Sequence, residues 1–214
     1  MWRVLYPPHA IKLLTMFTSF GIIYSLFANL EHQMESGMIL KPQDVLILLK
    51  LVAIGKENWS FSTLSTALYM SPSEVHAGIH RALAARLAVK ITDRVKPSIR
   101  SLEELIIHGL CYVFVPDRGE ITRGMPTLHA APPLSQVIVS SSDPPPVWPD
   151  PEGNVRGQSF SPLYKSVPKA ARQDRQLYEL LVLTDAIRGG RQREREIAMK
   201  EISKRLTGYD DGKS

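Results

Sequence analysis

The hydrophobic and polar residues between 42 and 58 alternate with the spacing of an α-helix. Pro42 can open this helix, and Gly55 and Asn58 can end it. Its apolar face would be formed by Val45, Leu46, Leu48, Leu49 and Val52. Trp59 and Phe61 follow directly and are expected in the core of the same domain. The pattern therefore predicts a soluble helical domain beginning near residue 39.

Residues 62–87 have the pattern of two helices joined by a tight turn at 69–71. Ser62 is the expected N-cap of the first helix, in which Leu64, Ala67 and Leu68 face inward. The second helix begins with Ser71 as N-cap, Pro72 at its first position and Glu74 three residues after the cap, which is a capping box. A well-capped helix behind a short one is the helix-turn-helix unit, which places side chains in the DNA major groove.

The second helix has an apolar stripe and a polar face, and a strand pattern follows it. The inward stripe consists of Val75, Ile79, Ala82 and Leu83. The residues left on or near the outward face are Ser73, His76, Ala77, His80 and Arg81. Leu87, Val89 and Ile91 then alternate with Ala88, Lys90 and Thr92, which predicts a strand. The cations expected on a wing are Lys90, Arg94, Lys96 and Arg100.

The chain between residues 101 and 170 has weaker patterns. Residues 101–110 predict a helix capped by Ser101, and residues 112–115 predict a short strand. Gly119 and Gly124 are expected to break the chain. Ten of the sixteen prolines lie in residues 126–168, which predicts an extended linker or a loop over the surface, without a helix or central strand. Trp148 is expected to anchor this segment to a groove.

Helical spacing returns in the tail. Residues 172–188 place five residues on one face: Leu177, Leu180, Leu181, Thr184 and Ile187. Gly189 and Gly190 interrupt the helix, and residues 191–206 form a second, loosely periodic helix. The tail is therefore predicted to be a helical hairpin or a kinked helix.

Residues 10–30 are apolar over a length that resembles a membrane span. Four interpretations remain open: a membrane anchor, a signal segment, an extra soluble helix, or a segment missing from the working protein because translation starts at Met34 or Met38. The last is favoured, because the patterned domain begins almost directly after Met38. A membrane partner is accordingly unexpected unless residues 10–30 are expressed and inserted.

The positive charge of the chain is concentrated in two regions. The net charge of +5 compares with +5 in residues 41–100, −4 in residues 101–160 and +4 in residues 161–214, counted from Lys, Arg, Asp and Glu. A basic helix-turn-helix segment favours a polyanionic partner. Cys111 is the single cysteine, so no intrachain disulfide can form, which fits a reducing cytoplasm. In its apolar surroundings it is interpreted as a small core residue.

Residues 40–100 resemble the winged helix-turn-helix of bacterial MarR-like transcriptional regulators. The resemblance rests on LKPQDVLILLKL, on LSTALYMSPSEVHAGIHRALAARL and on the strand that follows. The segments GEITRGMPTLHAAPPL and PPPVWPDPEGNVRG are similar to parts of uncharacterised bacterial proteins assigned to such regulators. The resemblance implies DNA binding and a dimer. The chain departs from the family after Thr92, where the wing is short and the usual dimerisation helices are not evident.

On this interpretation, DNA would contact the second helix and the wing. The expected DNA-binding residues are Ser71, Ser73, His76, His80, Arg81, Lys90, Arg94 and Lys96. The alternative is a helix-turn-helix that packs only against another protein. His76 and His80 have the i, i+4 spacing of some zinc sites, but no further ligand is near in the sequence, so solvent-facing polar residues are favoured.

Two other groups of residues are candidates for anion binding. The basic cluster in the tail consists of Arg188, Arg191, Arg193 and Arg195, interleaved with Glu194 and Glu196. It is interpreted as a solvated helix face with i, i+3 and i, i+4 pairs, and alternatively as a second phosphate-contacting surface. The triplet Thr122-Arg123-Gly124 is a weak candidate for an anion-binding loop. No catalytic, cofactor or metal-site motif is evident, so neither an enzyme nor a cofactor is predicted.

The expected fold is mainly α with a small β wing, followed by a proline-rich extended segment and a C-terminal helical hairpin. The expected division is an N-terminal extension (1–38), a winged helix-turn-helix domain (39–115), a proline-rich linker (116–170), a helical hairpin (171–208) and a tail (209–214). The expected function is a cytoplasmic transcriptional regulator that reads a short operator in double-stranded DNA through residues 72–86. The alternative is a protein-interaction module, such as an antitoxin-like or accessory subunit. A homodimer and a partner protein remain open as further partners.

Overall fold

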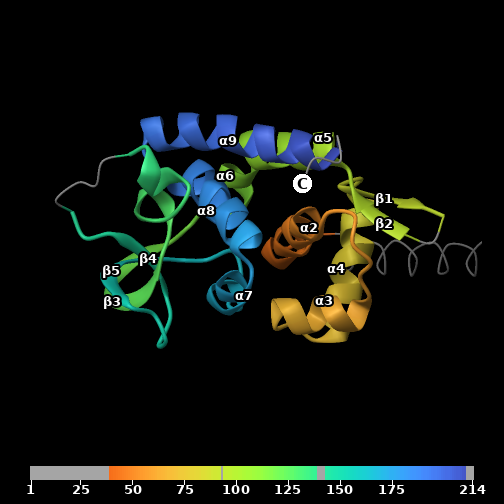
Figure 1. Ribbon diagram of the computed structural model, residues 1–214, viewed down its shortest axis with the longest axis horizontal. Coiled ribbons are helices and arrows are strands. Elements are labelled where there is room, and N and C mark those ends of the chain that lie inside the picture. Colours follow the sequence, from red (N-terminus) through yellow and green to blue (C-terminus); the bar gives the residue numbers. More distant parts are fainter. Residues whose placement is uncertain (1–38, 93, 139–142, 211–214) are drawn as a thin grey trace, which may run out of the picture. The chain divides into compact units, whose positions relative to one another are not determined.

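Figure 1 shows a computed structural model of the protein, which describes residues 39–92, 94–138 and 143–210. Residues from Leu40 onward form one compact unit, and this unit is described below. The predictions on the N-terminal extension 1–38, including its apolar stretch 10–30, lie outside the described residues. Within the described ranges, no helix combines the length and the apolar character needed to cross a membrane. The secondary structure is a mixture of helices and small sheets.

The first three helices of the described part of the chain have the order predicted for a helix-turn-helix domain. They are α2 (Pro42–Ile54), α3 (Phe61–Leu68) and α4 (Pro72–Ala84). The capping box at Ser71 and Glu74 is confirmed, since Ser71 Oγ accepts the Glu74 N–H at 3.2 Å and Glu74 Oε2 accepts the Ser71 N–H at 2.9 Å. The predicted N-cap of α3 is wrong: it is Ser60 rather than Ser62, because Ser60 and Thr63 cap each other reciprocally.

The turn and the helix crossing that follow depend on two backbone features. Tyr69 ends α3 in the left-handed region (φ 52°), which turns the chain toward α4. Gly78 lies where α4 crosses α2, and a Cβ at this position would collide with Ile47 Cδ1. The glycine therefore allows the two helices to approach closely. The predicted inward residues Val75, Ile79 and Ala82 are buried in this contact.

A short antiparallel hairpin follows α4. It consists of β1 (Ala88–Ile91) and β2 (Arg94–Pro97). The predicted strand is confirmed, and Val89 and Ile91 on it have exposed fractions of 44% and 53%. The hairpin extends past the helices in Figure 1, so no core covers the face of β1 that carries these two side chains.

The helix after the hairpin is longer than predicted. It runs through α5 (Ile99–Glu104), the π-helical turn η1 (Leu105–Gly109) and α6 (Leu110–Val113). Ser98, rather than Ser101, precedes its first turn, and the strand predicted at 112–115 is not formed, since α6 extends to Val113. The reason is an apolar row with helical spacing, Leu102, Ile106 and Leu110, which is fully buried and continues the helix beyond residue 110.

The proline-rich segment forms a small sheet, so the prediction of a linker without strands is wrong. Its strands are β3 (Arg118–Pro126), β4 (Pro146–Pro149) and β5 (Val155–Phe160), each paired with the other two in a closed arrangement. The strand β4 begins and ends with proline, which leaves its interior free for pairing. Short 3₁₀ turns η2 (Leu128–Ala130) and η3 (Leu134–Gln136) lie between β3 and β4.

Glycines that were expected to break the chain lie within this sheet. Gly119 and Gly124 both belong to β3. A Cβ on Gly124 would collide with the carbonyl oxygen of Trp148, and a Cβ on Gly157 would collide with that of Pro145. These glycines therefore permit the close backbone approach that closes a sheet of only three strands. Thr122-Arg123-Gly124, proposed as an anion-binding loop, is part of this strand and not a loop.

The prediction that Trp148 anchors the proline-rich segment is confirmed. The side chain is fully buried, its Nε1 donates a hydrogen bond to Asp185 Oδ2 at 2.6 Å, and its ring meets Tyr178 edge-on at 5.7 Å. Asp185 and Tyr178 both lie on α8, so this tryptophan ties the small sheet to the helices of the tail.

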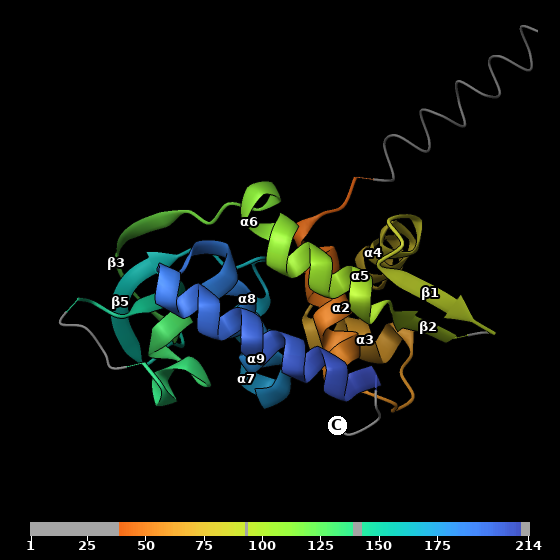
Figure 2. The same ribbon diagram turned by 90° about the horizontal axis from the view of Figure 1, so that it is seen from above.

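The tail contains α7 (Val167–Gln173), α8 (Arg175–Gly189) and α9 (Gln192–Asp210). The α8–α9 pair is the predicted helical hairpin, and the five residues expected on its apolar face are buried. Figure 2 shows α9 lying along α8 and reaching α5, while α8 packs against α2. The tail helices therefore lie against α2 and α3, and Lys50 on α2 binds Asp174 at 2.7 Å across this contact.

Candidate functional site

The exposed face of α4 carries four of the predicted DNA-binding residues. Ser71, Ser73, His76 and His80 are all exposed, as the helical spacing predicted. The two histidine rings lie against each other, with their centroids 4.4 Å apart. Polar side chains are thus available along the first three turns of this helix.

Arg81 does not belong to this face, and its predicted exposure is wrong. The guanidinium is buried against α2, where Nε donates to Asp44 Oδ2 at 2.7 Å and Nη2 donates to Asp44 Oδ1 at 2.6 Å. Asp44 is fully buried, and its hydrogen bond raises the pKa of Arg81. The helical period places Arg81 at the edge of the apolar stripe, and a buried carboxylate on α2 draws it inward. Arg81 is therefore a structural cation.

The three predicted cations of the hairpin are exposed but lie on two faces. In the hairpin register, Arg94 pairs with Ile91, Lys96 with Val89, and Lys90 with Val95. Since cross-strand partners point to the same side of a sheet, Arg94 and Lys96 share a face with the two exposed aliphatic residues of β1. Lys90 lies on the other face.

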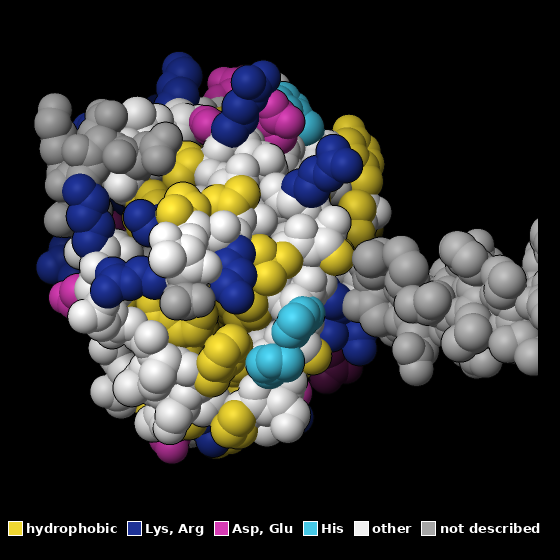
Figure 3. All heavy atoms as spheres, turned by 90° about the vertical axis from the view of Figure 1, so that its right-hand side faces the viewer, with side chains coloured by type: hydrophobic (Ala, Val, Ile, Leu, Met, Phe, Trp, Pro, Cys, Tyr) yellow, Lys and Arg dark blue, Asp and Glu magenta, His cyan; other side chains and the backbone are white. Residues whose placement is uncertain are grey.

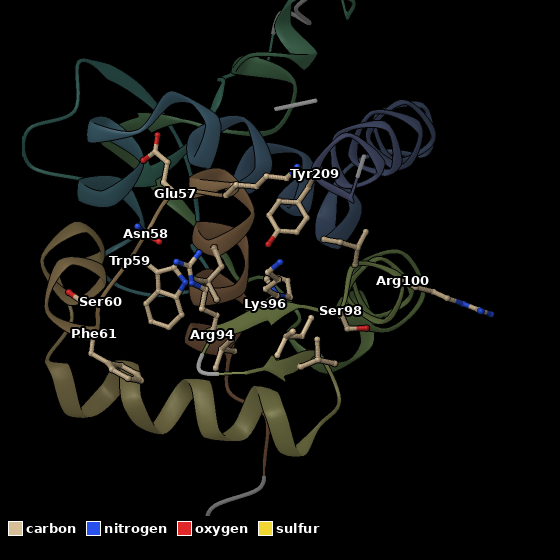
Figure 4. A pocket seen from close by; sticks show the side chains of 18 residues that line it. Glu57, Asn58, Trp59, Ser60, Phe61, Arg94, Lys96, Ser98, Arg100 and Tyr209 are labelled. Carbon is tan, nitrogen blue, oxygen red and sulfur yellow. The ribbon is translucent and has the colours of Figure 1, made fainter. Parts of the chain in front are cut away.

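A groove of about 750 Å³ lies between this hairpin and the loop that joins α2 to α3. Its remaining walls come from the start of α5 and the end of α9. Its lining includes Trp59, Phe61, Val89, Ile91, Arg94 and Lys96. In Figure 4, Arg94 and Lys96 extend into the hollow, as does Tyr209, whereas Arg100 points away from it. The name "hairpin groove" is used below for this site.

A row of aromatic rings joins the groove to the exposed face of α4. The ring centroids of Trp59 and Phe61 are 5.6 Å apart, and those of Phe61 and His76 are 5.3 Å apart. Phe61, expected in the core, has an exposed fraction of 38%, while Trp59 is half-buried against the core. Figure 3 shows two histidines beside hydrophobic side chains on this side of the molecule, with Lys and Arg side chains nearby. The α4 face and the hairpin groove therefore form one continuous surface, which periodicity alone did not predict.

The N-terminus of α4 is held by a tyrosine from the tail. Tyr164 donates a hydrogen bond to Glu74 Oε1 at 2.5 Å. This bond, together with those from the Ser71 N–H and hydroxyl, lowers the pKa of Glu74 to about 2. The same bond raises the pKa of Tyr164 to about 12. Lys165 lies beside the pair and also favours the charged carboxylate.

Replacement of Tyr164 by phenylalanine should raise the pKa of Glu74 from about 2 toward the ordinary value of 4.5, because the largest cause of the lowering is removed. A lowered carboxyl pKa stabilises the fold above pH 4.5, and this stabilisation is lost as the pH falls through about 2. An NMR pH titration of the Glu74 carboxyl measures the shift. Tyr178→Phe is the control, since Tyr178 donates to Pro126 O instead and should leave Glu74 unchanged. If the pKa of Glu74 is unchanged in Tyr164→Phe, the hydrogen bond from Tyr164 is not the main cause of the lowered pKa.

The basic cluster of the tail is only partly a solvated face. Arg188 is buried and donates to Ser161 O at 2.5 Å, and Glu194 is buried against His129, with Oε1 at 2.9 Å from Nδ1. Arg191 binds Asp143 at 2.7 Å, while Arg193 is exposed. The predicted interpretation as a wholly solvated face is therefore wrong, because the cluster lies at the junction of α8, α9 and the small sheet.

Two smaller predictions concern cysteine and metal chemistry. Cys111 is half-buried rather than fully in the core, and its Sγ lies 4.0 Å from Arg195. Among the described residues, no group of three or more His, Cys, Asp and Glu side chains is arranged to hold a metal ion.

Comparison with known proteins found no match to a family model, a curated protein or a solved structure. The resemblance to MarR-like regulators therefore stays a prediction that rests on the residues quoted for it.

Proposed function

We propose that the protein is a winged helix-turn-helix transcriptional regulator that binds double-stranded DNA through α4 and the β1–β2 hairpin. The observation that carries this proposal is the continuous surface formed by the exposed polar face of α4 and the cations of the hairpin groove. The order of α2, α3, α4 and the hairpin is compatible with a winged helix, in which α4 would be the recognition helix and the hairpin the wing.

Different residues of this surface suit different contacts. The hydroxyl of Ser73 and the imidazoles of His76 and His80 can hydrogen-bond base edges or phosphates along the major groove. Arg94 and Lys96 can neutralise phosphates beside the site, and within the described part of the chain neither forms an ion pair. Lys90 would contact phosphates from the other face of the wing. Glu74 opposes an approaching phosphate, and the neighbouring Lys165 offsets part of this charge.

The salt dependence of binding tests the proposal. Fluorescence anisotropy of the full chain would be measured with the duplex from upstream of its own gene and with a scrambled duplex, across a salt series. We expect tight binding to the first duplex only. The double variant Arg94→Gln/Lys96→Gln should reduce the slope of log K against log salt by about 1.8, since each phosphate contact contributes about 0.9.

The matched control is Arg123→Gln/Arg156→Gln. These two arginines are also exposed cross-strand partners, but they lie on β3 and β5 of the other sheet. The control should keep the slope of the wild type. Equal slopes for the two double variants, or equal affinity for both duplexes, would contradict sequence-reading DNA binding through this surface.

A second candidate function, a protein-interaction module, is favoured by a separate observation. The hairpin exposes the aliphatic side chains of Val89 and Ile91 on the face that lines the groove. Neither side chain offers a hydrogen bond to a base or a charge to a phosphate, so their exposure points to an apolar contact.

A further inference from the structure

The hairpin groove combines apolar and cationic side chains in an ordered way. Strand β1 supplies Val89 and Ile91, and strand β2 supplies Lys96 and Arg94 directly opposite them. The groove face of the hairpin therefore carries an aliphatic row beside a cationic row. Trp59 and Phe61 complete the apolar part from the opposite wall.

The charge of the groove is complementary to an acidic occupant. Among the described residues, its lining contains the cations Lys56, Arg94 and Lys96 and one carboxylate, Glu57; a fourth lining cation, Arg100, points away from the hollow and pairs with Glu104. Figure 4 shows that Glu57 directs its carboxylate away from the hollow, into which Arg94 and Lys96 extend. In the described part of the chain, Lys56, Arg94 and Lys96 form no ion pair, so their charges are available to a partner.

We propose that the hairpin groove binds an acidic peptide segment of a partner protein that carries large apolar side chains. The apolar side chains would pack between Trp59 and the aliphatic row of β1, and the carboxylates would pair with Arg94 and Lys96. This arrangement resembles the general mode in which an extended segment places alternate side chains in pockets and gains specificity from them. A nucleic acid strand would use the aromatic rings and the cations but would leave Val89 and Ile91 without a suitable partner.

The peptide proposal does not depend on DNA binding, but one consequence of it does. Arg94 and Lys96 are also the cations assigned to phosphate contacts under the proposed function. If both assignments hold, peptide and duplex compete for the same two side chains. Binding of the partner would then release the protein from DNA. A stable ternary complex of protein, duplex and peptide would contradict this shared use. Peptide binding and DNA binding would then each be judged from its own binding assay.

The test begins with selection of binders to the full chain from a displayed library of random peptides of about ten residues, the length of a typical groove-binding segment. We expect the selected sequences to be enriched in Asp and Glu together with Leu, Phe or Trp. A selected peptide, synthesised with a fluorescent label, would then be titrated against variants of the groove. Selection of basic peptides, or of none that bind in solution, would overturn the proposal.

Two variants separate the apolar contact from the ionic one. Val89→Thr/Ile91→Thr keeps β-branched side chains, and therefore the strand, but removes the aliphatic surface. Arg94→Gln/Lys96→Gln removes the charge. Each should weaken peptide binding about tenfold or more, as expected for side chains at the centre of an interface. Arg123→Gln/Arg156→Gln should bind as the wild type does.

The same variants distinguish a peptide from a nucleic acid as occupant. Val89→Thr/Ile91→Thr should leave binding to the upstream duplex and to a single-stranded oligonucleotide unchanged. If this variant weakens oligonucleotide binding and leaves peptide binding intact, the groove is a nucleic acid site and the proposal fails. If peptide binding fails while the duplex still binds with the expected salt slope, the proposed function stands without the groove proposal.

Discussion

Replacement of Arg81 by alanine should lower the free energy of unfolding by about 3–5 kcal/mol, the usual cost of removing one partner from a buried ion pair. Asp44 is fully buried, and Arg81 supplies two of its hydrogen bonds, at 2.6 and 2.7 Å. After the substitution, the backbone N–H of Lys41, at 2.8 Å, would be its remaining donor among the described residues. Urea denaturation of the full chain measures the effect as a lower midpoint with an unchanged slope.

Two further variants show whether the loss comes from the unpaired charge. Arg100→Ala removes a cation whose side chain is 91% exposed and should change stability by less than about 0.5 kcal/mol, as expected for a surface pair. Asp44→Leu/Arg81→Met replaces both charges by apolar groups and should recover most of the loss. A loss of stability of under about 1 kcal/mol for Arg81→Ala alone would show that other hydrogen-bond donors replace Arg81 at the Asp44 carboxylate.

This result also affects how DNA binding is tested. Arg81 lies on α4, the proposed recognition helix, and the sequence alone predicted it to contact DNA, so it is the obvious residue to replace. Its burial means that Arg81→Ala would reduce DNA binding by destabilising the domain, whatever surface contacts DNA. Substitutions at Arg94 and Lys96 avoid this ambiguity, because both side chains are exposed.

The elements that sequence alone predicted well are those specified by local signals. The capping box at Ser71 and Glu74 defines the start of α4, and Gly189 and Gly190 define the break between α8 and α9. Such signals act within one turn of helix and need no knowledge of the partner element. The helix-turn-helix order and the helical hairpin of the tail were therefore predictable.

The elements that sequence alone missed depend on long-range contacts. The strands of the proline-rich segment pair only because β3 meets β4 and β5 across the segment 127–145, after which β4 and β5 pair in parallel with each other. The hairpin groove could not be predicted for the same reason, since Trp59, Val89 and Arg94 come from separate elements. One signal could have suggested the buried ion pair: Asp44 lies in an otherwise apolar helix, and a buried acid requires a cation.

Trp148→Ala should destabilise the fold by about 3–5 kcal/mol, the range for removing a large aromatic side chain from a core. The ring is fully buried between the small sheet and α8, and its Nε1 donates to Asp185 Oδ2 at 2.6 Å. Both the cavity left by the ring and the loss of its hydrogen-bond donor contribute to this destabilisation. Because this side chain joins the sheet to the helices, we expect β3–β5 to become susceptible to proteolysis before the helical elements do.

The contribution of the hydrogen bond is separated by Trp148→Phe, which keeps an aromatic ring but removes the donor and should cost about 1–3 kcal/mol. Burial raises the pKa of Asp185, while the bond from Trp148 acts in the opposite direction. Removing the bond should therefore raise this pKa further. A raised carboxyl pKa costs stability at a pH where the group must be charged, so the deficit of Trp148→Phe relative to the wild type should grow as the pH rises. Urea midpoints measured between acid and neutral pH test this trend, and a deficit independent of pH would show that the bond to Asp185 contributes nothing beyond the packing of the ring.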